Sequence, residues 1–496
     1  MKRILIYLSL LIMGASCTYE FPDTDVKVNG GTADFSKFVC IGDNFTSGFM
    51  NGALYSEGQK NSIGSLISQQ LDDASVLPFF QADINSDNGY NPFYSDSSNV
   101  YGKMVYMYPM INSEDPVIQK LPGEFPGTFD GDRNLLTDFS IPSLKSYQIA
   151  DPGLSGNPYF NRIAVNPGTS TLLQQTTNAS PTFFFMWLGL YDALHFAATG
   201  ALGDYDPPSD PLLLAENDLT PEDVFENSIR EIVAQLLSNP QTKGIIANLP
   251  SIEDFPFFYN YQYDFIRLSN SQKANAQNHY ADFNLAVAQH NQLPEHEQRP
   301  FIDFNDNGQT LFPQPIVVYD DSLADGIDLY GGPLPKIRQL VPGEMVLHSL
   351  PIEQVQYGLG WMNPLSKNYY LNAFDVHVVQ VAINKFNDII DQVVSEYPDR
   401  LALVDLNTSI GDLASTGRVD SWGIPENPEL KYIDGLPLRA DLSINSAFSL
   451  DGLHFSQRGT AWVSNLIIDT INQYFGSNIP LLEVNQYVGN TILGSK

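Results

Sequence analysis

Asp451 and His454 form the spacing in this sequence that most directly indicates catalysis. An aspartate three residues before a histidine can accept the imidazole N–H, which fixes the tautomer and stabilises the charged ring. The pair lies just before a predicted helix, and of the seven histidines only His454 has this context. His195 follows Asp192 by three residues, but inside a predicted helix start, where a surface or capping role is expected. We therefore expect Asp451 to orient His454 as a base.

Asn44 is a second position where chemistry is expected. It follows a short apolar run at 38–41, which is typical of a buried strand, and the Gly42-Asp43 turn. The small residues that come next favour a helix packed close to a sheet. A strand-turn-helix corner brings the turn side chain to the carboxyl edge of a parallel sheet, where open α/β folds bind their ligands.

The run Gly42-Asp43-Asn44-Phe45-Thr46-Ser47-Gly48, continued at 51–55, resembles the first signature block of SGNH (GDSL-type) esterases and lipases. In that family the position of Asn44 carries the nucleophilic serine. Residues 448–456 resemble the last block, which supplies the catalytic histidine and its carboxylate, here His454 and Asp451. The resemblance runs from about 38 to 476. It implies a flavodoxin-like three-layer α/β/α sandwich with a parallel sheet.

The resemblance assigns two further positions to an oxyanion hole. Residues 159–170 resemble the second block, whose glycine donates a backbone N–H, and Gly168 is the candidate, although Asn-Pro-Gly is also an ordinary turn. The sequence Gly189-Leu190-Tyr191-Asp192 stands where the family has Gly-x-Asn-Asp. Tyr191 therefore occupies the place of the asparagine donor.

The residues at positions 44 and 191 argue against efficient ester hydrolysis. Asn44 retains a backbone N–H but has no hydroxyl, and the delocalised lone pair of its amide is not nucleophilic. Loss of one oxyanion donor, as at Tyr191, raises an acyl-transfer barrier by about 2.7–4 kcal/mol. Three functions are consistent with this pattern. They are a silent domain that binds an acyl, ester or glycan ligand, a residual ester hydrolase in which Asp451 and His454 activate water, and an interaction scaffold of an envelope uptake system.

Alternation of strands and helices predicts an α/β fold. Buried strands are expected at 182–188, 244–250 and 401–405, and helices at 63–71, 224–237, 374–397 and after residue 456. We expect one domain over 35–496, with insertions at about 77–160 and 250–370. The first of these is rich in Pro, Gly, Asp, Asn and Tyr without a sustained period, and is expected to shape the site.

The N-terminus predicts an export signal and a lipid anchor. Lys2 and Arg3 precede an apolar run at 4–13, and small residues at 14–16 precede Cys17. Residues 1–16 are therefore expected to be a lipoprotein signal peptide, Cys17 the acylated residue, and 17–34 an acidic tether. Simple secretion is the alternative. The chain is expected at the outer membrane, on either the periplasmic or the surface face, with the membrane and an outer-membrane protein as partners.

The charge and the pattern of possible metal ligands limit the classes of partner and cofactor that the chain is expected to bind. The net charge of −32 argues against nucleic acid, because phosphate binding depends on Lys and Arg. The run from Asp303 to Gly308 matches half of a calcium loop, but Gln314 stands where a bidentate carboxylate is needed, so we interpret it as an acidic turn. We predict no metal and no cofactor. With Cys17 acylated, Cys40 has no disulfide partner and is expected in the core.

Overall fold

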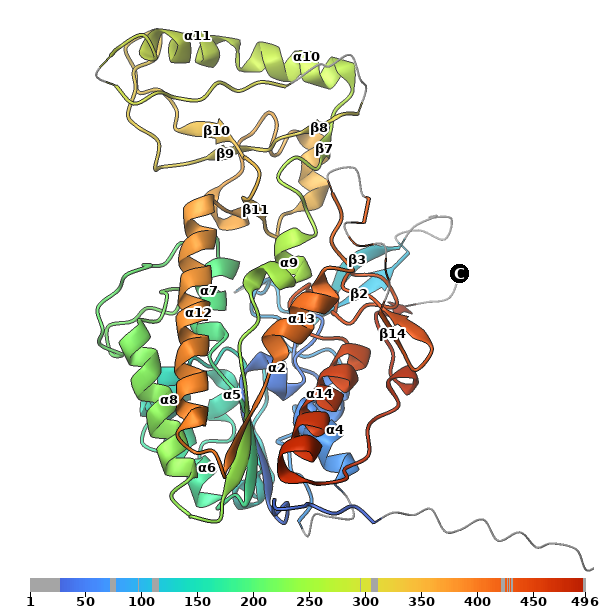
Figure 1. Cartoon of the computed structure of the whole chain (residues 1–496). Helices are drawn as coiled ribbons and strands as arrows, with labels where there is room; N and C mark the ends of the chain where they lie inside the picture. The colour runs from blue at the N-terminus through green and yellow to red at the C-terminus, as the bar shows by residue number, and fades with distance from the viewer. Residues whose placement is uncertain are drawn as a thin grey trace, which may run out of the picture.

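Five parallel strands form the central sheet of the computed structural model (Figure 1). The model describes residues 27–493 apart from 72–76, 97, 109–115, 295, 305–310, 421–423, 426, 428 and 430. Neighbouring strands pair in parallel throughout. In spatial order they are β13 (Leu401–Val404), β6 (Lys243–Ala247), β5 (Phe183–Trp187), β1 (Phe38–Gly42) and β4 (Asp138–Ser140).

Helices cover both faces of this sheet, so its strands are buried on two sides and consist largely of apolar residues. On one face α4 (Ile63–Gln70) packs against α14 (Gln457–Phe475). On the other, α12 (Ala373–Ser395) contacts both α7 (Tyr191–Ala198) and α8 (Glu222–Leu236), and α6 (Leu172–Asn178) also packs on α8. Shorter helices occupy the connections: α2 (Asn44–Ser47), α3 (Ser56–Lys60), α5 (Pro158–Asn161) and α13 (Leu406–Ala414).

The predicted strands and helices are confirmed to within a few residues. The buried runs expected at 182–188, 244–250 and 401–405 are β5, β6 and β13. The helices expected at 63–71, 224–237 and 374–397 are α4, α8 and α12, and α14 follows the histidine segment. A capping box between Asn372 and Asp375 fixes the start of α12.

The segment 77–160 contributes a strand to the central sheet, which its sequence did not predict. Strand β4 has only three residues, too few for a periodic pattern, and pairs with β1 through Cys40 and Asp138. The same segment forms an antiparallel ribbon of β2 (Tyr101–Met107) and β3 (Val117–Pro122). A short strand near the C-terminus, β16 (Ile492–Leu493), pairs with β2.

Residues 266–370 have a hydrophobic core of their own, separate from the core around the sheet. The chain leaves the carboxyl end of β6, passes through α9 (Pro256–Tyr259) and returns through β12 (Tyr370–Leu371) to α12. The lobe built in between therefore stands beyond the carboxyl edge of the sheet (Figure 1). Its elements are β7 (Ile266–Arg267), α10 (Asn270–His279), α11 (Ala281–His290), β8 (Pro313–Gln314), β9 (Val317–Tyr319), β10 (Ile337–Gln339) and β11 (Met345–Val346). One further hairpin, β14 (Lys431–Ile433) with β15 (Leu436–Leu438), lies near the start of the last helix in sequence.

Candidate functional site

The candidate site lies where the order of the parallel strands reverses. From β1 the chain goes to β4 on one side, and it then forms β5 on the other side of β1. Ligands of open α/β sheets bind outside the carboxyl ends of the strands at such a point. Asn44 is the first residue of α2, directly after β1, and Tyr191 is the first residue of α7, after β5. Asn44 and Tyr191 therefore lie at the same edge of the sheet.

Asp43 builds the corner that holds Asn44. Its carboxyl group accepts the N–H of Phe45 at 2.9 Å and so caps the one-turn helix α2, which Gly48 ends at φ 83°. Burial, together with the nearby charge of Asp192, raises the pKa of Asp43 to about 8. The carboxyl group is therefore mostly protonated at neutral pH, and its Oδ1 atom accepts the Phe45 N–H.

Asp451 holds His454 through both ends of its carboxylate. One oxygen accepts the backbone N–H groups of Leu453 and His454 at 2.9 and 2.8 Å, and the other lies 3.0 Å from His454 Nδ1. Burial opposes the charged form, but His454 and these donors outweigh it and lower the pKa of Asp451. Since an ionised carboxylate can only accept, Nδ1 carries a proton, and Nε2 is the acceptor when the imidazole is neutral. The predicted role of Asp451 as the orienting partner of the histidine matches this geometry.

The segment that follows α2 anchors the histidine turn. Gly52 donates its N–H to Asp451 Oδ2 at 2.6 Å, and Asn51 donates its N–H to the hydroxyl of Ser449 at 2.9 Å. The Asn51 side chain in turn accepts the N–H of Leu450 at 3.1 Å. Both Asn51 and Gly52 have positive φ, a conformation that aims their two N–H groups into the turn. Segments near the two ends of the chain are therefore joined at the site by three buried or half-buried hydrogen bonds.

The Tyr191 hydroxyl lies in the place where a nucleophile would meet the histidine. Its oxygen is 3.4 Å from His454 Nε2, and the Asn44 side chain also hydrogen-bonds it. The amide oxygen of Asn44 accepts the N–H of Ser143 at 2.5 Å. Burial, and the charges of Asp43 and Asp451, raise the pKa of Tyr191 well above its ordinary value, so the hydroxyl stays protonated. A protonated phenol fixed between two partners is a poor nucleophile.

The three side chains are sealed from solvent. Asn44 and His454 are each 1% exposed and Tyr191 is 2% exposed. Phe45 and Phe49 close over the imidazole, with ring centroids 5.1 and 4.8 Å from that of His454. Further aromatic rings then pack on Phe45, namely Trp187, Phe255 and Phe455. An ester has no path to the imidazole in this conformation.

Gly168 is not the backbone donor at the site. It lies in an exposed turn, where its N–H donates to the Ser155 hydroxyl at 2.7 Å. The N–H that meets the side chain at position 44 belongs to Ser143, three residues beyond β4, held at φ 65°. The Asn-Pro-Gly pattern around Gly168 is an ordinary turn with no further role at the site. A proline shortly after a strand, Pro142, is the only local sequence signal that marks the position of Ser143.

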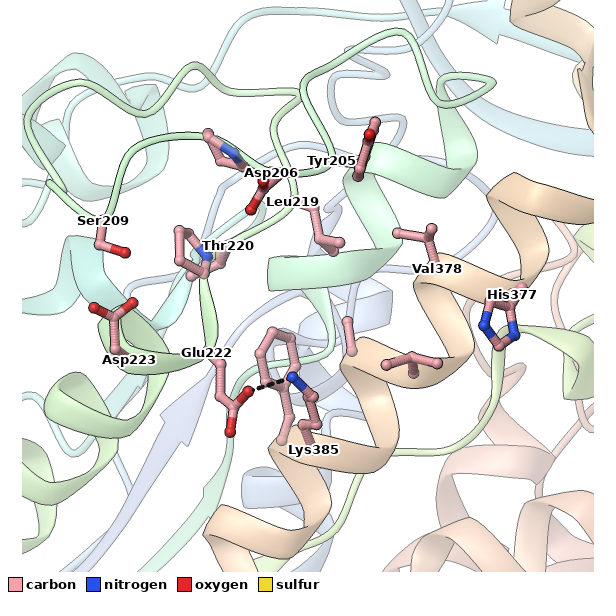
Figure 2. Close-up of a pocket in the computed structure, with 15 residues that line it drawn as sticks. Tyr205, Asp206, Ser209, Leu219, Thr220, Glu222, Asp223, His377, Val378 and Lys385 are labelled. Atoms are coloured by element: carbon pink, nitrogen blue, oxygen red, sulfur yellow. Dashed lines mark hydrogen bonds and ion pairs between the residues drawn. The ribbon is translucent and has the colours of Figure 1, made fainter.

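Among the cavities near this edge of the sheet are two that are not lined by Asn44, Tyr191 or His454. One, of about 420 Å³, includes Ser143 and His195 in its wall. His195 is therefore not on the open surface, because its side chain is only 12% exposed. The other cavity, of about 380 Å³, lies between α8 and α12, where Lys385 pairs with Glu222 at 2.5 Å (Figure 2).

Other sequence predictions concern metals, cysteines and the termini. Among the described residues, no cluster of three or more His, Cys, Asp or Glu side chains could hold a metal ion. Most of the half calcium loop, and Cys17 with the signal peptide, lie outside the described residues. Cys40 is fully buried in β1, as expected, and forms no disulfide. No helix in the described part of the chain is long and apolar enough to cross a membrane.

Comparison of the chain with protein-family models, with curated proteins and with solved structures finds no match.

Proposed function

We propose that this chain is an SGNH-like envelope lipoprotein whose old catalytic centre is silent, and which binds an acyl, ester or glycan ligand beside that centre. The observation that carries the proposal is the contact of His454 Nε2 with a protonated Tyr191 hydroxyl, in a site whose nucleophile position is Asn44. A histidine base accelerates acyl transfer only when it can deprotonate a nucleophile that reaches the substrate. Neither Asn44 nor Tyr191 meets that condition.

The architecture supports the SGNH assignment as a proposal. A parallel sheet with helices on both faces carries Asn44 after β1, Tyr191 after β5 and the Asp451/His454 pair before the last long helix. These are the places where the family resemblance puts its nucleophile, its side-chain oxyanion donor and its histidine. The chain departs from the family resemblance at the second block, because the backbone N–H that meets the Asn44 side chain is that of Ser143.

A comparison of ester turnover tests the silent site. We expect the wild-type chain and its His454→Ala variant to hydrolyse p-nitrophenyl acetate and butyrate at the same rate, because the imidazole has no nucleophile to activate. His377→Ala is the matched control, since His377 lines the separate cavity of Figure 2 and should not affect any turnover at His454. Circular dichroism of the three proteins checks that each is folded.

The residual-hydrolase alternative gives a different result in the same assay. If His454 activated water directly, wild-type turnover would exceed that of His454→Ala and would equal that of His377→Ala. A general base of this kind contributes about 10²–10⁴-fold, which such an assay resolves. That result would refute the silent-site proposal. The low exposure of His454, at 1%, is the reason we expect the opposite.

A further inference from the structure

The 420 Å³ cavity at the carboxyl edge shares a wall with the buried histidine site but remains open to solvent. Ser143 lines it and donates its N–H inward to Asn44 at 2.5 Å. The rest of its lining comes from Tyr90 and Pro92, from residues 142–159 after β4, from His195 in α7, and from Leu214 and Glu216. Glu216 has a side chain that is 77% exposed, so solutes can reach the cavity. The volume lies within the range of about 300–1,000 Å³ that is typical of small-molecule sites.

Three tyrosines line this cavity. Tyr147 and Tyr159 are largely buried, and Tyr90 is half-buried. The Tyr159 hydroxyl donates to the Tyr90 carbonyl oxygen at 3.2 Å, which fixes the two residues relative to each other. Rigid aromatic rings offer a large contact area at low entropic cost. They suit a ligand that presents apolar C–H faces.

The charged groups around the cavity do not favour an anion. Lys145 is buried and its ammonium group is turned toward the carbonyl oxygen of Asp218 at 2.6 Å. Burial, and the charge of Lys145, lower the pKa of His195 to about 4, so the imidazole is neutral at pH 7. The carboxylates of Asp151 and Glu216 are the remaining charges in the lining. They would repel a fatty-acid carboxylate or a phosphate.

His195 also has an unused hydrogen-bonding atom. Its Nδ1 is buried and has no hydrogen-bond partner, and the nearest carboxylate oxygen, Glu216 Oε1, is 4.0 Å away. A buried polar atom without a partner is rare in proteins, and a ligand in the cavity could hydrogen-bond this one. Gln148, Asp151 and Glu216 add amide and carboxylate groups to the same lining. The cavity therefore combines aromatic faces with hydrogen-bonding groups and no accessible cation.

We propose that this cavity binds an uncharged, hydroxyl-rich ligand of the size of a short glycan. Sugar rings match the lining, because their C–H faces pack on tyrosine rings while their hydroxyls donate to carboxylates and exchange hydrogen bonds with imidazole and amide groups. The inference rests on the proposed ligand-binding function. It narrows the ligand class from acyl, ester or glycan to glycan.

Saturation-transfer NMR and calorimetry on the full chain test the inference. The probes are the neutral disaccharides maltose, lactose, cellobiose and xylobiose, the anionic digalacturonate, and laurate as the acyl probe. We expect a neutral disaccharide to bind, and digalacturonate to bind at least about tenfold more weakly, since two carboxylates line the cavity. Tyr147→Ala should weaken binding of the neutral sugar about tenfold or more, because a stacking face is lost.

Two further variants keep the test decisive. The Glu216 side chain is exposed, so Glu216→Gln should leave the protein folded. The variant should discriminate less strongly against digalacturonate. Tyr205→Ala is the matched control, because Tyr205 lines the other cavity (Figure 2) and should leave sugar binding unchanged. Absence of binding by all four neutral sugars, or binding that Tyr205→Ala weakens and Tyr147→Ala does not, would overturn the glycan inference.

The outcomes also separate this inference from the proposed function. One possible outcome is that laurate binds, that its binding is lost in Tyr147→Ala, and that no sugar binds. The glycan inference would then fail, whereas the proposal of a silent, ligand-binding domain would stand. Ester turnover that disappears in His454→Ala would instead overturn the proposed function, whatever the sugars do.

Discussion

Asn44 connects three parts of the site through one side chain. Its amide oxygen accepts the N–H of Ser143, and its side chain also hydrogen-bonds the Tyr191 hydroxyl that faces His454. A serine at this position would have a single hydroxyl for the same partners. The asparagine thus satisfies polar groups that would otherwise be buried without partners, which is a structural use of a position suited to catalysis.

Asp451 should be a stability determinant even if no reaction occurs at the site. Asp451→Ala leaves the N–H groups of Gly52, Leu453 and His454, and the imidazole Nδ1–H, without an acceptor in a buried place. We expect the free energy of unfolding to fall by about 3–5 kcal/mol in urea denaturation. Asp451→Asn, which keeps one carbonyl oxygen, should cost less.

The control for Asp451 is Asp469→Ala, on the exposed side of α14. Surface substitutions of this kind usually change stability by no more than about 0.5 kcal/mol. Equal losses for the two alanine variants would contradict the structural role given to Asp451. We expect Asp451→Ala to be less stable than wild type, and no variant to show ester hydrolysis that depends on the site.

Asp43 should make stability depend on pH. In the unfolded chain its carboxyl group ionises near pH 3.8, whereas burial raises the pKa in the folded chain to about 8. Between these values only the unfolded chain releases the proton, so the contribution present below about pH 4 is lost as the pH rises toward 8. Asp43→Asn keeps an acceptor for the Phe45 N–H and has no such cost. Its stability relative to wild type should therefore increase from pH 5 to pH 9.

Urea unfolding of both proteins at the two pH values measures this increase. Asp34→Asn serves as the control, because Asp34 is exposed and its side chain likewise accepts a backbone N–H, that of Ser36. The difference between Asp34→Asn and wild type should be the same at pH 5 and pH 9. A difference between Asp43→Asn and wild type that does not change with pH would contradict the raised pKa.

At the scale of elements, the segment around α9 that leads into the lobe at 266–370 closes the site. We call this segment the stem of the lobe. The N–H of Phe257 in α9 donates to the Gly452 carbonyl at 2.9 Å, and His348 Nε2 lies 3.2 Å from the carbonyl oxygen of Leu450. Phe255, just before α9, packs on Phe45 with a centroid separation of 5.7 Å. The lobe is therefore tied to both the histidine turn and the aromatic cover of the imidazole.

Gly452 tests how closely the stem and the turn must approach. It has φ 73°, and a Cβ there would lie 2.9 Å from the backbone nitrogen of Phe257. Gly435 has a similar φ of 79°, but its Cβ would meet open space. Gly435→Ala should lower the free energy of unfolding by about 1–2 kcal/mol, from backbone strain alone. Gly452→Ala should cost about 1–3 kcal/mol more, because the overlap forces the backbone apart. Equal losses would show that the contact between stem and turn can relax freely.

At the scale of the whole molecule, an acidic globular chain is expected to be tethered to a membrane through Cys17. The net charge of −32 disfavours direct contact with anionic surfaces, so a lipid is the means of attachment that we expect. The sheet, the lobe at 266–370 and the 420 Å³ cavity all lie beyond residue 34. A tether of this kind would present them at a distance from the bilayer.

Fractionation tests the anchor. We expect the mature chain in the membrane fraction, with an acylated Cys17 at its N-terminus by mass spectrometry, and Cys17→Ser in the soluble fraction. The control is Cys40→Ser, since Cys40 is fully buried in β1 and cannot be reached by an acyl transferase in the folded chain. A wild-type chain with a different N-terminus, or one that stays soluble, would refute the anchor.

Local sequence determined the parts of the site that depend on short spacing. The Asp451-x-x-His454 turn, the Asn44 corner and the strand before Tyr191 follow from turn residues and apolar runs within about ten positions. The α/β class follows in the same way, because a buried parallel strand and an amphipathic helix each have a distinct pattern. These features are the same in the structure as predicted.

Only the tertiary structure decided which donor meets Asn44, whether solvent reaches His454, and what covers the sheet edge. The N–H of Ser143 is a backbone group 99 residues away from Asn44, and a backbone donor leaves no mark on residue type. The short strand β4 that places it has no period that could have marked it, and the prediction of Gly168 came from the family resemblance instead. The seal over the imidazole is made by rings from segments far apart in the chain, Phe45, Phe49, Phe255 and Phe455. Packing between such segments is a property of the folded chain, so sequence spacing alone could not reveal it.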